Sequence, residues 1–213
     1  MQAVKQYEVE TSSGETIEVK LFDLISYSTS FHAMSEFAIN REEDSTDQIW
    51  LLQHPPVYTQ GTACDQETLR MSDIPVVKSD RGGQITYHGP GQIIMYPLLK
   101  LKRYDIGVKS LVSSLEQSVI NVLEKYQISS ERRQDAPGVY INQAKISALG
   151  LRIKRGTSYH GLSFNIDMDL TPFNNIDPCG YQGLQVTQLV NHCSIVDIDL
   201  IQRQLVKEFV DLI

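Results

Sequence analysis

Three strand-like segments follow one another in the second half of the chain, and they constrain the fold more than any other feature. They span residues 138 to 142, 145 to 153 and 158 to 166, and Arg155-Gly156-Thr157 predicts a tight turn between the last two. Strands joined so closely form antiparallel hairpins, because a parallel connection needs about a dozen residues or more. The segments therefore argue against a purely parallel βαβ order.

Apolar residues at helical spacing predict three helices. The clearest stripe runs from Val108 to Tyr126, a second occupies residues 27 to 39, and a third runs from Ile198 to Leu212. Because no repeat or linker-like tract divides the chain, we expect one α/β (α+β type) domain over residues 1–213. Short apolar or alternating segments predict further strands at residues 16 to 22, 49 to 52, 75 to 78 and 93 to 99.

The charge balance restricts the partners. The chain carries 19 Lys and Arg against 26 Asp and Glu, a formal net charge of −7. A surface this acidic disfavours general binding to nucleic acid. No apolar run reaches the roughly 18 residues of a membrane span, and the first residues lack the apolar core of a secretory signal. We therefore expect a cytoplasmic protein that binds neither nucleic acid nor membrane.

Metal and disulfide chemistry find little support in the sequence. The three cysteines, Cys64, Cys179 and Cys193, are an odd number spread over a long chain, which is unlike a disulfide framework. No Cys-x-x-Cys pair and no His-x-x-x-His pair occurs. We therefore expect neither a structural zinc site nor a metal cofactor.

Three stretches combine glycine with unusual polar residues. The first, RGGQITYHGPGQ, covers residues 81 to 92, the second has Lys145 before the run ISALGL, and the third holds Cys179 between Pro and Gly. Taken singly, each has a structural explanation, because glycines form tight turns, a strand-end lysine reaches solvent, and most cysteines are buried and inert. The functional alternative is a ligand-facing loop, a partly desolvated ammonium and a reactive thiol.

Taken together, these stretches resemble the octanoyltransferases of lipoate biosynthesis, also called lipoyl(octanoyl) transferases. The resemblance rests on six blocks that occur in the family's order. They read HPPVYT, RGGQITYHGPGQ, DAPGVY, KISALGLRI, YHGLSFNI and PCGY, and they begin at residues 54, 81, 135, 145, 159 and 178. So many ordered blocks are far more specific than one short motif.

The resemblance implies a fold and an activity. The family is similar to biotin and lipoate ligases, so we expect a mixed β-sheet flanked by helices and a tunnel for an acyl chain. The family moves an octanoyl group from octanoyl-acyl carrier protein to a lysine of a lipoyl domain, and it needs no cofactor. By resemblance, Cys179 is the nucleophile that forms a thioester and Lys145 is its acid–base partner. A nearby ammonium favours the thiolate of a thiol, whose ordinary pKa is about 8.5.

The resemblance also assigns residues around the acyl group. Backbone N–H groups near Gly180 or in a Leu149–Gly150 turn are candidates for the oxyanion site. His88 and His160 either hydrogen-bond to Lys145, Cys179 or a backbone carbonyl, or only brace loops. The implied substrate-binding residues are Arg81, Gly82, Gly83, Gln84, Ile85, Thr86, Tyr87, His88, Ala148, Leu149, Gly150, Gly161, Leu162 and Ser163.

The implied partners are octanoyl-acyl carrier protein as donor and, as acceptors, the lipoyl domains of 2-oxoacid dehydrogenases and the glycine cleavage H protein. A monomer is the default expectation. Because acyl carrier proteins are strongly acidic, we expect a basic patch near the pocket mouth to dock the donor. The candidate patches are Lys100, Lys102 and Arg103, then Arg132 and Arg133, then Arg152, Lys154 and Arg155.

Three alternatives stay open at this point. An ATP-dependent lipoate–protein ligase shares the scaffold but uses an acyl-adenylate and no nucleophilic cysteine. A lipoyl amidotransferase uses a cysteine and differs in its acyl donor. A non-catalytic module would bind acylated carrier proteins without forming an acyl-enzyme. The Pro-Cys-Gly sequence at residues 178 to 180 favours the transferase over the ligase.

Overall fold

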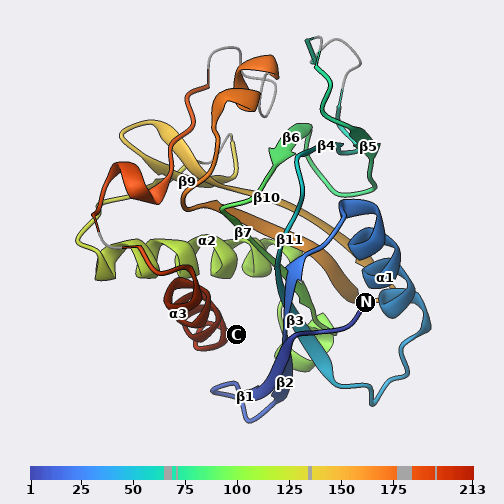
Figure 1. Ribbon diagram of the computed structural model, residues 1–213. Coiled ribbons are helices and arrows are strands. Elements are labelled where there is room, and N and C mark those ends of the chain that lie inside the picture. Colours follow the sequence, from blue (N-terminus) through green and yellow to red (C-terminus); the bar gives the residue numbers. More distant parts are fainter. Residues whose placement is uncertain (65–68, 71, 134–135, 177–183, 195) are drawn as a thin grey trace.

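A twisted eight-stranded sheet forms the centre of the molecule (Figure 1). Its neighbouring strands are antiparallel except for the second and third, so the expected mixed sheet is confirmed. The strands, in spatial order, are β1 (Lys5–Glu10), β2 (Thr16–Leu24), β3 (Asp47–Gln53), β7 (Gln92–Leu98), β11 (Thr157–Asn165), β10 (Ala144–Lys154), β9 (Gly138–Ile141) and β8 (Glu131–Arg132). This computed structural model describes residues 1–64, 69–70, 72–133, 136–176, 184–194 and 196–213.

The three strands expected in succession are present as β9, β10 and β11, and they pair as antiparallel neighbours. The turn between β10 and β11 is where it was expected, and Arg155 and Gly156 both have positive φ there, at 49° and 77°. The pairing of β9 with β10 slips between Lys145 and Ser147, which is a β-bulge. A bulge changes the direction in which the side chains of a strand point. This irregularity lies at Lys145, the lysine that the sequence singles out.

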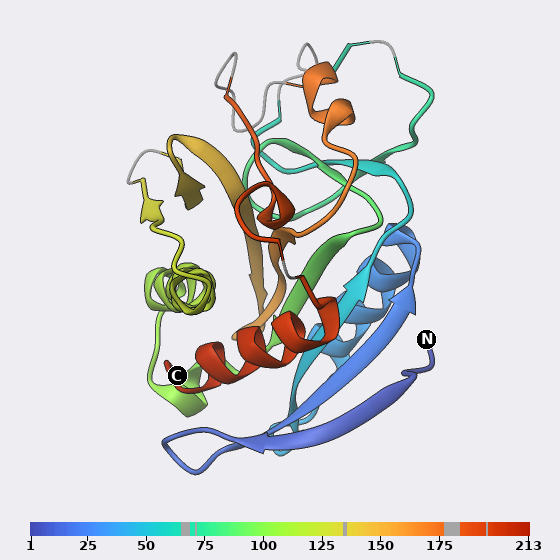
Figure 2. The same cartoon turned by 60° about the vertical axis from the view of Figure 1, so that its left-hand side comes forward.

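Helices cover both faces of the sheet (Figures 1 and 2). Helices α2 (Val108–Lys125) and α3 (Ile198–Val210) pack on one face, and α1 (Tyr27–Asn40) packs on the other. Alternation along β3 explains this, because Ile49 and Leu51 join the core under α2 and α3 whereas Trp50 and Leu52 join the core under α1. A sheet buried on both faces needs such a continuous apolar run.

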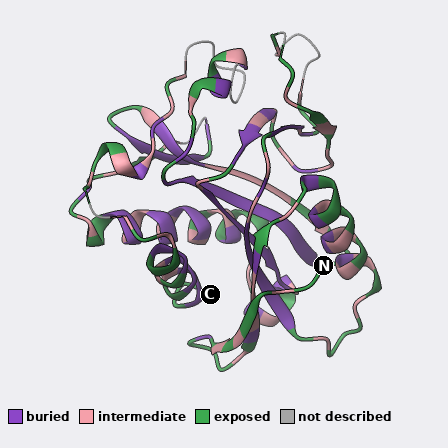
Figure 3. Cartoon of the chain, in the orientation of Figure 1, coloured by how far each residue is buried: buried purple, intermediate pink, exposed green. Residues whose placement is uncertain are grey.

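The three predicted helices are confirmed to within a residue or two at their ends. Ser26 caps α1 by accepting a hydrogen bond from the backbone N–H of Thr29, and Asp197 caps α3 through the N–H of Leu200. Each helix turns its buried residues to the sheet and its exposed residues outward (Figure 3). None of the helices in the described parts of the chain is both long and apolar enough to cross a membrane.

A second, three-stranded sheet lies beside the first in the order β5-β4-β6. Its strands are β4 (Val57–Gln60), β5 (Val76–Lys78) and β6 (Ile85–His88). Tyr58 and Tyr87 from this sheet pack with Phe173 from a 3-10 helix, η3 (Thr171–Asn175). Further 3-10 helices are η2 (Leu101–Tyr104) and η5 (Leu189–Asn191).

Candidate active site

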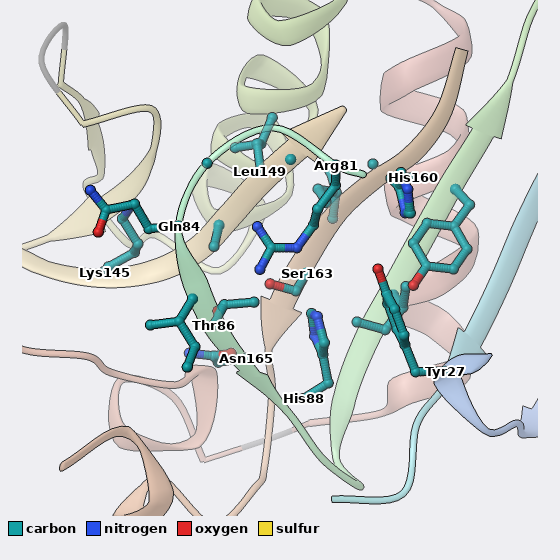
Figure 4. A pocket seen from close by; sticks show the side chains of 18 of the residues that line it. Tyr27, Arg81, Gln84, Thr86, His88, Lys145, Leu149, His160, Ser163 and Asn165 are labelled. Atoms are coloured by element: carbon teal, nitrogen blue, oxygen red, sulfur yellow. The ribbon is translucent and has the colours of Figure 1, made fainter. Parts of the chain in front are cut away.

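A pocket lies between the glycine-rich segment that begins at Arg81 and the strands β10 and β11 (Figure 4). All the residues implied as substrate-binding line it, except Gly82 and Tyr87. Lys145 lines the pocket as well, on the side of Gln84 and away from Tyr27 and His160 in the view of Figure 4. Thus the structure brings together residues from three separate sequence blocks.

Gly82 and Tyr87, which do not line the pocket, contact residues next to it. The backbone N–H of Gly82 donates to the carbonyl of Leu151 on β10 at 3.0 Å. The ring of Tyr87 packs against Tyr58 and Phe173, with centroids 5.6 and 5.4 Å away. Cys179 lies outside the described residues.

Lys145 is almost fully buried, with a relative exposure of 3%. Its Nζ donates a hydrogen bond to the carbonyl of Pro137 at 3.0 Å and lies 5.1 Å from the ring centroid of Tyr140. The Tyr140 hydroxyl donates in turn to the carbonyl of Ala136 at 2.6 Å. The structural explanation, a strand-end lysine that reaches into solvent, is therefore wrong, because the bulge turns the side chain toward the pocket.

The backbone of Lys145 carries a second set of contacts. Its N–H donates to the carbonyl of Gln185 at 2.8 Å, and its carbonyl accepts from the N–H of Thr187 at 2.9 Å. The intervening Val186 forms an isolated parallel bridge with Lys145 and lines the pocket. A segment about forty residues further along the chain is thus fixed beside the lysine.

The guanidinium of Arg81 is buried and anchors the glycine-rich segment. Its Nε and Nη2 donate to the hydroxyl of Thr59 on β4 at 3.1 and 2.9 Å, and Nη1 donates to the carbonyl of Gly82 at 2.9 Å. Gly150 lies directly against this segment, because a Cβ there would come within 2.9 Å of the Gly82 carbonyl oxygen and 3.1 Å of Arg81 Cδ. Glycine at this position allows the two backbones to meet.

The expected Leu149–Gly150 turn is wrong. Both residues lie inside β10, where they pair with Leu162 and Gly161 of β11. A glycine within a strand often marks a close approach of another backbone rather than a turn, and Gly82 is that neighbour here.

Two buried histidines have defined partners on the pocket wall or behind it. The Nδ1–H of His88 donates to Gln92 Oε1 at 2.7 Å, and its Nε2 lies 3.3 Å from the Thr59 hydroxyl. His54 donates through Nδ1 to the carbonyl of Ile25 at 2.6 Å and accepts the Tyr96 hydroxyl proton at Nε2 at 2.8 Å. Burial lowers the pKa of His54 to about 4 and the pKa of His88 well below its usual value. Both rings are therefore neutral at pH 7.

His160 lies in the middle of β11 with a left-handed backbone, φ 57°. Its Nε2–H donates to Asp80 Oδ1 at 2.9 Å, and burial lowers the pKa of the imidazole. Its Nδ1 is buried and has no hydrogen-bond partner among the described residues. Both His88 and His160 are thus oriented by polar side chains that hold them in place.

Several lining residues were missed from the sequence. They are Tyr27, Ile94, Tyr96, Asn165, Phe173 and Val186. Of these, Asn165 lies in the family block at residues 159 to 166, which was a usable signal. The others are ordinary core residue types, and nothing in their local sequence separates a pocket wall from a core. In the described part of the chain, no three His, Cys, Asp or Glu side chains gather as a metal site would require.

Comparison with known proteins identifies the class. The family model described as the lipoyl protein ligase A/B catalytic domain matches residues 26–210. The fold agrees with that family, because a lipoate-protein ligase A bound with ATP superposes with a TM-score of 0.72 at 13% identity, over 90% of this chain and 83% of that one. A biotin protein ligase from Aquifex aeolicus, in complex with biotin and ATP, superposes with a TM-score of 0.60 at 14% identity, over 90% and 68%. The chain thus has the catalytic fold shared by lipoate and biotin ligases.

Sequence relatives narrow the class further. An octanoyltransferase from Nitrosomonas eutropha is 56% identical over 81% of this chain and 77% of that protein. Another, from Shewanella woodyi, is 46% identical over 92% of this chain and 90% of that protein. The chain therefore belongs to the octanoyltransferases, a group of acyltransferases, and the resemblance seen in its sequence blocks is confirmed.

Proposed function

We propose that this chain transfers an octanoyl group from the thioester of octanoyl-acyl carrier protein to the lysine ε-amine of a lipoyl domain. The reaction runs through a thioester on Cys179, with Lys145 as acid and base. Family membership supports the octanoyl transfer. The observation that carries the proposal is Lys145, a buried amine that lines a pocket together with the residues of the family blocks.

The first half-reaction exchanges one thioester for another. The Cys179 thiolate attacks the octanoyl carbonyl, a carbon–sulfur bond forms, and the carrier's sulfur leaves and takes a proton from Lys145. Because the bond formed resembles the bond broken, this step needs no ATP.

The second half-reaction forms the stable product. The acceptor's lysine amine attacks the acyl-enzyme, gives a proton to Lys145, and displaces the Cys179 thiolate. The product is an amide, and the enzyme returns to its starting state. Two half-reactions through one covalent intermediate give ping-pong kinetics.

The backbone contacts of Lys145 support the proposal that Lys145 and Cys179 lie close together. Gln185 and Thr187, which follow Cys179 by a few residues in the sequence, are hydrogen-bonded to Lys145. On the other side of that cysteine, Ile176 bridges to Leu69. The described chain is thus anchored close to Cys179 in sequence on both sides, and one anchor is the lysine itself.

The pocket wall suits an acyl chain. Ile85, Ile94, Leu149, Leu162 and Phe173 line it. Each methylene moved from water to such a surface contributes about 0.8 kcal/mol, so the chain supplies binding energy while its carbonyl stays near the amine.

Intact-mass spectrometry after mixing the protein with octanoyl-acyl carrier protein, without ATP, tests the proposal. We expect wild type to gain one octanoyl mass that hydroxylamine removes, and Cys179→Ser to gain none. Cys193→Ser is the matched control, because Cys193 packs against the main core, and it should acylate like wild type. An absent adduct on wild type, or acylation that requires ATP, would exclude the covalent route and favour a ligase or a binding module.

A further inference from the structure

We propose that Glu116 is a positioning residue that acts on the Lys145 amine through the peptide bond between Pro137 and Gly138. The inference rests on the proposed function, since it explains how the structure holds the group that we assign as acid and base. Glu116 lies on α2, outside the pocket, and no family block includes it.

Glu116 is an exception on its helix. The neighbouring buried positions of α2 include Leu111, Leu115, Val119 and Val122, whereas Glu116 is a carboxylate with a relative exposure of 7%. Burial of an ionised carboxylate is costly unless hydrogen bonds and opposite charges compensate for lost hydration. A buried glutamate among mostly apolar neighbours therefore needs a specific partner.

The partner is the backbone N–H of Gly138. Glu116 Oε1 accepts this hydrogen bond at 2.8 Å. Burial raises the pKa of Glu116, while the Gly138 N–H, Arg132 and Lys145 act in the opposite direction. Arg132 Nε lies 3.5 Å from the other carboxylate oxygen and is partly exposed, so a cation faces that side.

The same peptide unit binds Lys145 at its other end. The N–H of Gly138 and the carbonyl of Pro137 belong to one planar peptide, and this carbonyl accepts the hydrogen bond from Lys145 Nζ at 3.0 Å. The two hydrogen bonds form a chain from carboxylate to N–H, through the peptide, to carbonyl and ammonium. Each bond in such a chain polarises the next, so a negative charge on Glu116 strengthens the carbonyl as an acceptor for the ammonium.

Gly138 makes this restraint necessary. Its φ is +143°, and a Cβ there would lie 3.1 Å from Lys145 Cε and 2.6 Å from the Ser147 carbonyl oxygen. Glycine is thus required beside the lysine, but glycine is also the residue with the most backbone freedom. The hydrogen bond to Glu116 restrains the Gly138 backbone, and so it fixes the Pro137 carbonyl that accepts from the Lys145 amine.

Two substitutions separate the charge of Glu116 from its hydrogen bond. Glu116→Gln keeps an acceptor for the Gly138 N–H and removes the negative charge, whereas Glu116→Leu removes both. Glu124→Gln is the matched control, because Glu124 is an exposed glutamate on the same helix. Thermal unfolding of each variant identifies any general loss of stability, and the near-isosteric Gln variant carries the test if the Leu variant folds poorly.

The first measurement is independent of catalysis. Each lysine is labelled competitively with trace acetic anhydride from neutral to alkaline pH, and labelled peptides are quantified by mass spectrometry. In Glu116→Gln we expect Lys145 to be labelled roughly three- to tenfold faster at fixed pH, because the ammonium loses the charge that stabilises it. Lys125 and the Glu124→Gln variant should label as in wild type.

The second measurement is octanoyl transfer as a function of pH. In Glu116→Gln we expect the pH–rate profile of transfer to move to lower pH, with KM for the donor unchanged. In Glu116→Leu we expect kcat to fall about tenfold or more, because the acceptor peptide is no longer held. Wild-type labelling and transfer profiles in both variants would overturn the inference. A wild type that forms no acyl-enzyme would refute the proposed function instead, and the labelling result would still decide the role of Glu116.

Discussion

At the scale of single residues, Gly138 shows how local geometry limits what the site tolerates. Its positive φ strains any other residue, and a Cβ would press on the Ser147 carbonyl and on Lys145. We expect Gly138→Ala to lower the free energy of unfolding by about 1–3 kcal/mol and to reduce octanoyl transfer strongly. Urea unfolding and a transfer assay measure the two effects.

Gly14 provides the comparison for this variant. It also has positive φ, +85°, but a Cβ there would meet nothing within 4 Å. Gly14→Ala should therefore lose about 1 kcal/mol through backbone strain alone and keep full transfer activity. If Gly138→Ala and Gly14→Ala lost transfer activity equally, a clash between a Cβ at position 138 and Lys145 would be excluded as the cause.

Residues of the site differ in how far the sequence could predict them. Lys145 and the glycines at 82, 83 and 150 stand in blocks whose order is specific, so motif comparison found them. Glu116, by contrast, interrupts an apolar helical stripe. From the sequence alone a single charge there indicates a solvent-facing residue, because its contact with Gly138 of β9 is visible only in the structure. The bonds of His54 and His160 depend on Ile25, Tyr96 and Asp80, which are distant in sequence.

At the scale of elements, aromatic rings from different strands and a helix meet at the wall of the pocket. His54 follows β3, His88 ends β6 and His160 lies in β11, and all three approach Tyr27 of α1 within 6.4 Å between ring centroids. All three histidines are buried, and burial lowers the pKa of each imidazole. Neutral histidines thus help to join the two sheets to α1.

This arrangement makes stability depend on pH. The unfolded chain protonates His54 below about pH 6.5, whereas the folded chain resists until about pH 4, so the free energy of unfolding falls as pH falls between these values. Near pH 5 this residue alone accounts for about 2 kcal/mol. We expect His54→Gln to reduce the difference between urea unfolding at neutral pH and near pH 5 by about that amount.

His32 is the control for this experiment. It lies on the exposed side of α1, where its side chain pairs with Glu36. His32→Gln should leave the pH dependence of unfolding as in wild type. If His54→Gln left the pH dependence of unfolding unchanged, groups other than His54 would account for the loss of stability in acid.

The elements themselves were predicted unevenly. The long helices and the β9–β10–β11 meander were predicted because their apolar periodicity extends over many residues. Strands β4, β6 and β8 were missed because two to four residues show no periodicity, and β6 lies within a glycine-rich stretch. Strand β1 was missed because its residues are exposed or half-buried at the sheet edge.

At the scale of the whole molecule, charge bears on docking, because the donor that we propose is acidic and this chain also has a net negative charge. Several of the candidate basic residues are already paired, since Lys100 contacts Glu43, Arg103 contacts Asp47 and Arg132 contacts Glu116. Arg152 is exposed on β10, and its charge acts on Asp80, which bonds to the pocket residue His160. Arg152 is therefore a candidate whose charge is felt by the Asp80–His160 pair beside the pocket.

We expect Arg152→Glu to lower kcat/KM for octanoyl-acyl carrier protein several-fold and to weaken its dependence on salt, because long-range attraction steers the donor. Transfer from a small uncharged octanoyl thioester should be unchanged. Lys207→Glu on the exposed face of α3 serves as the control for a general change in charge. Equal rates for wild type and Arg152→Glu with the carrier protein would exclude this docking surface.

The pairing of Lys145 with Gln185 and Thr187 also has a consequence for the time course of folding. Contacts between residues about forty positions apart form later than local helices and hairpins, because the intervening loop must close first. During synthesis, the lysine leaves the ribosome well before the segment that holds it. The pocket is therefore among the last parts of the molecule to be completed, and in a growing chain it stays unfinished until the final third has emerged.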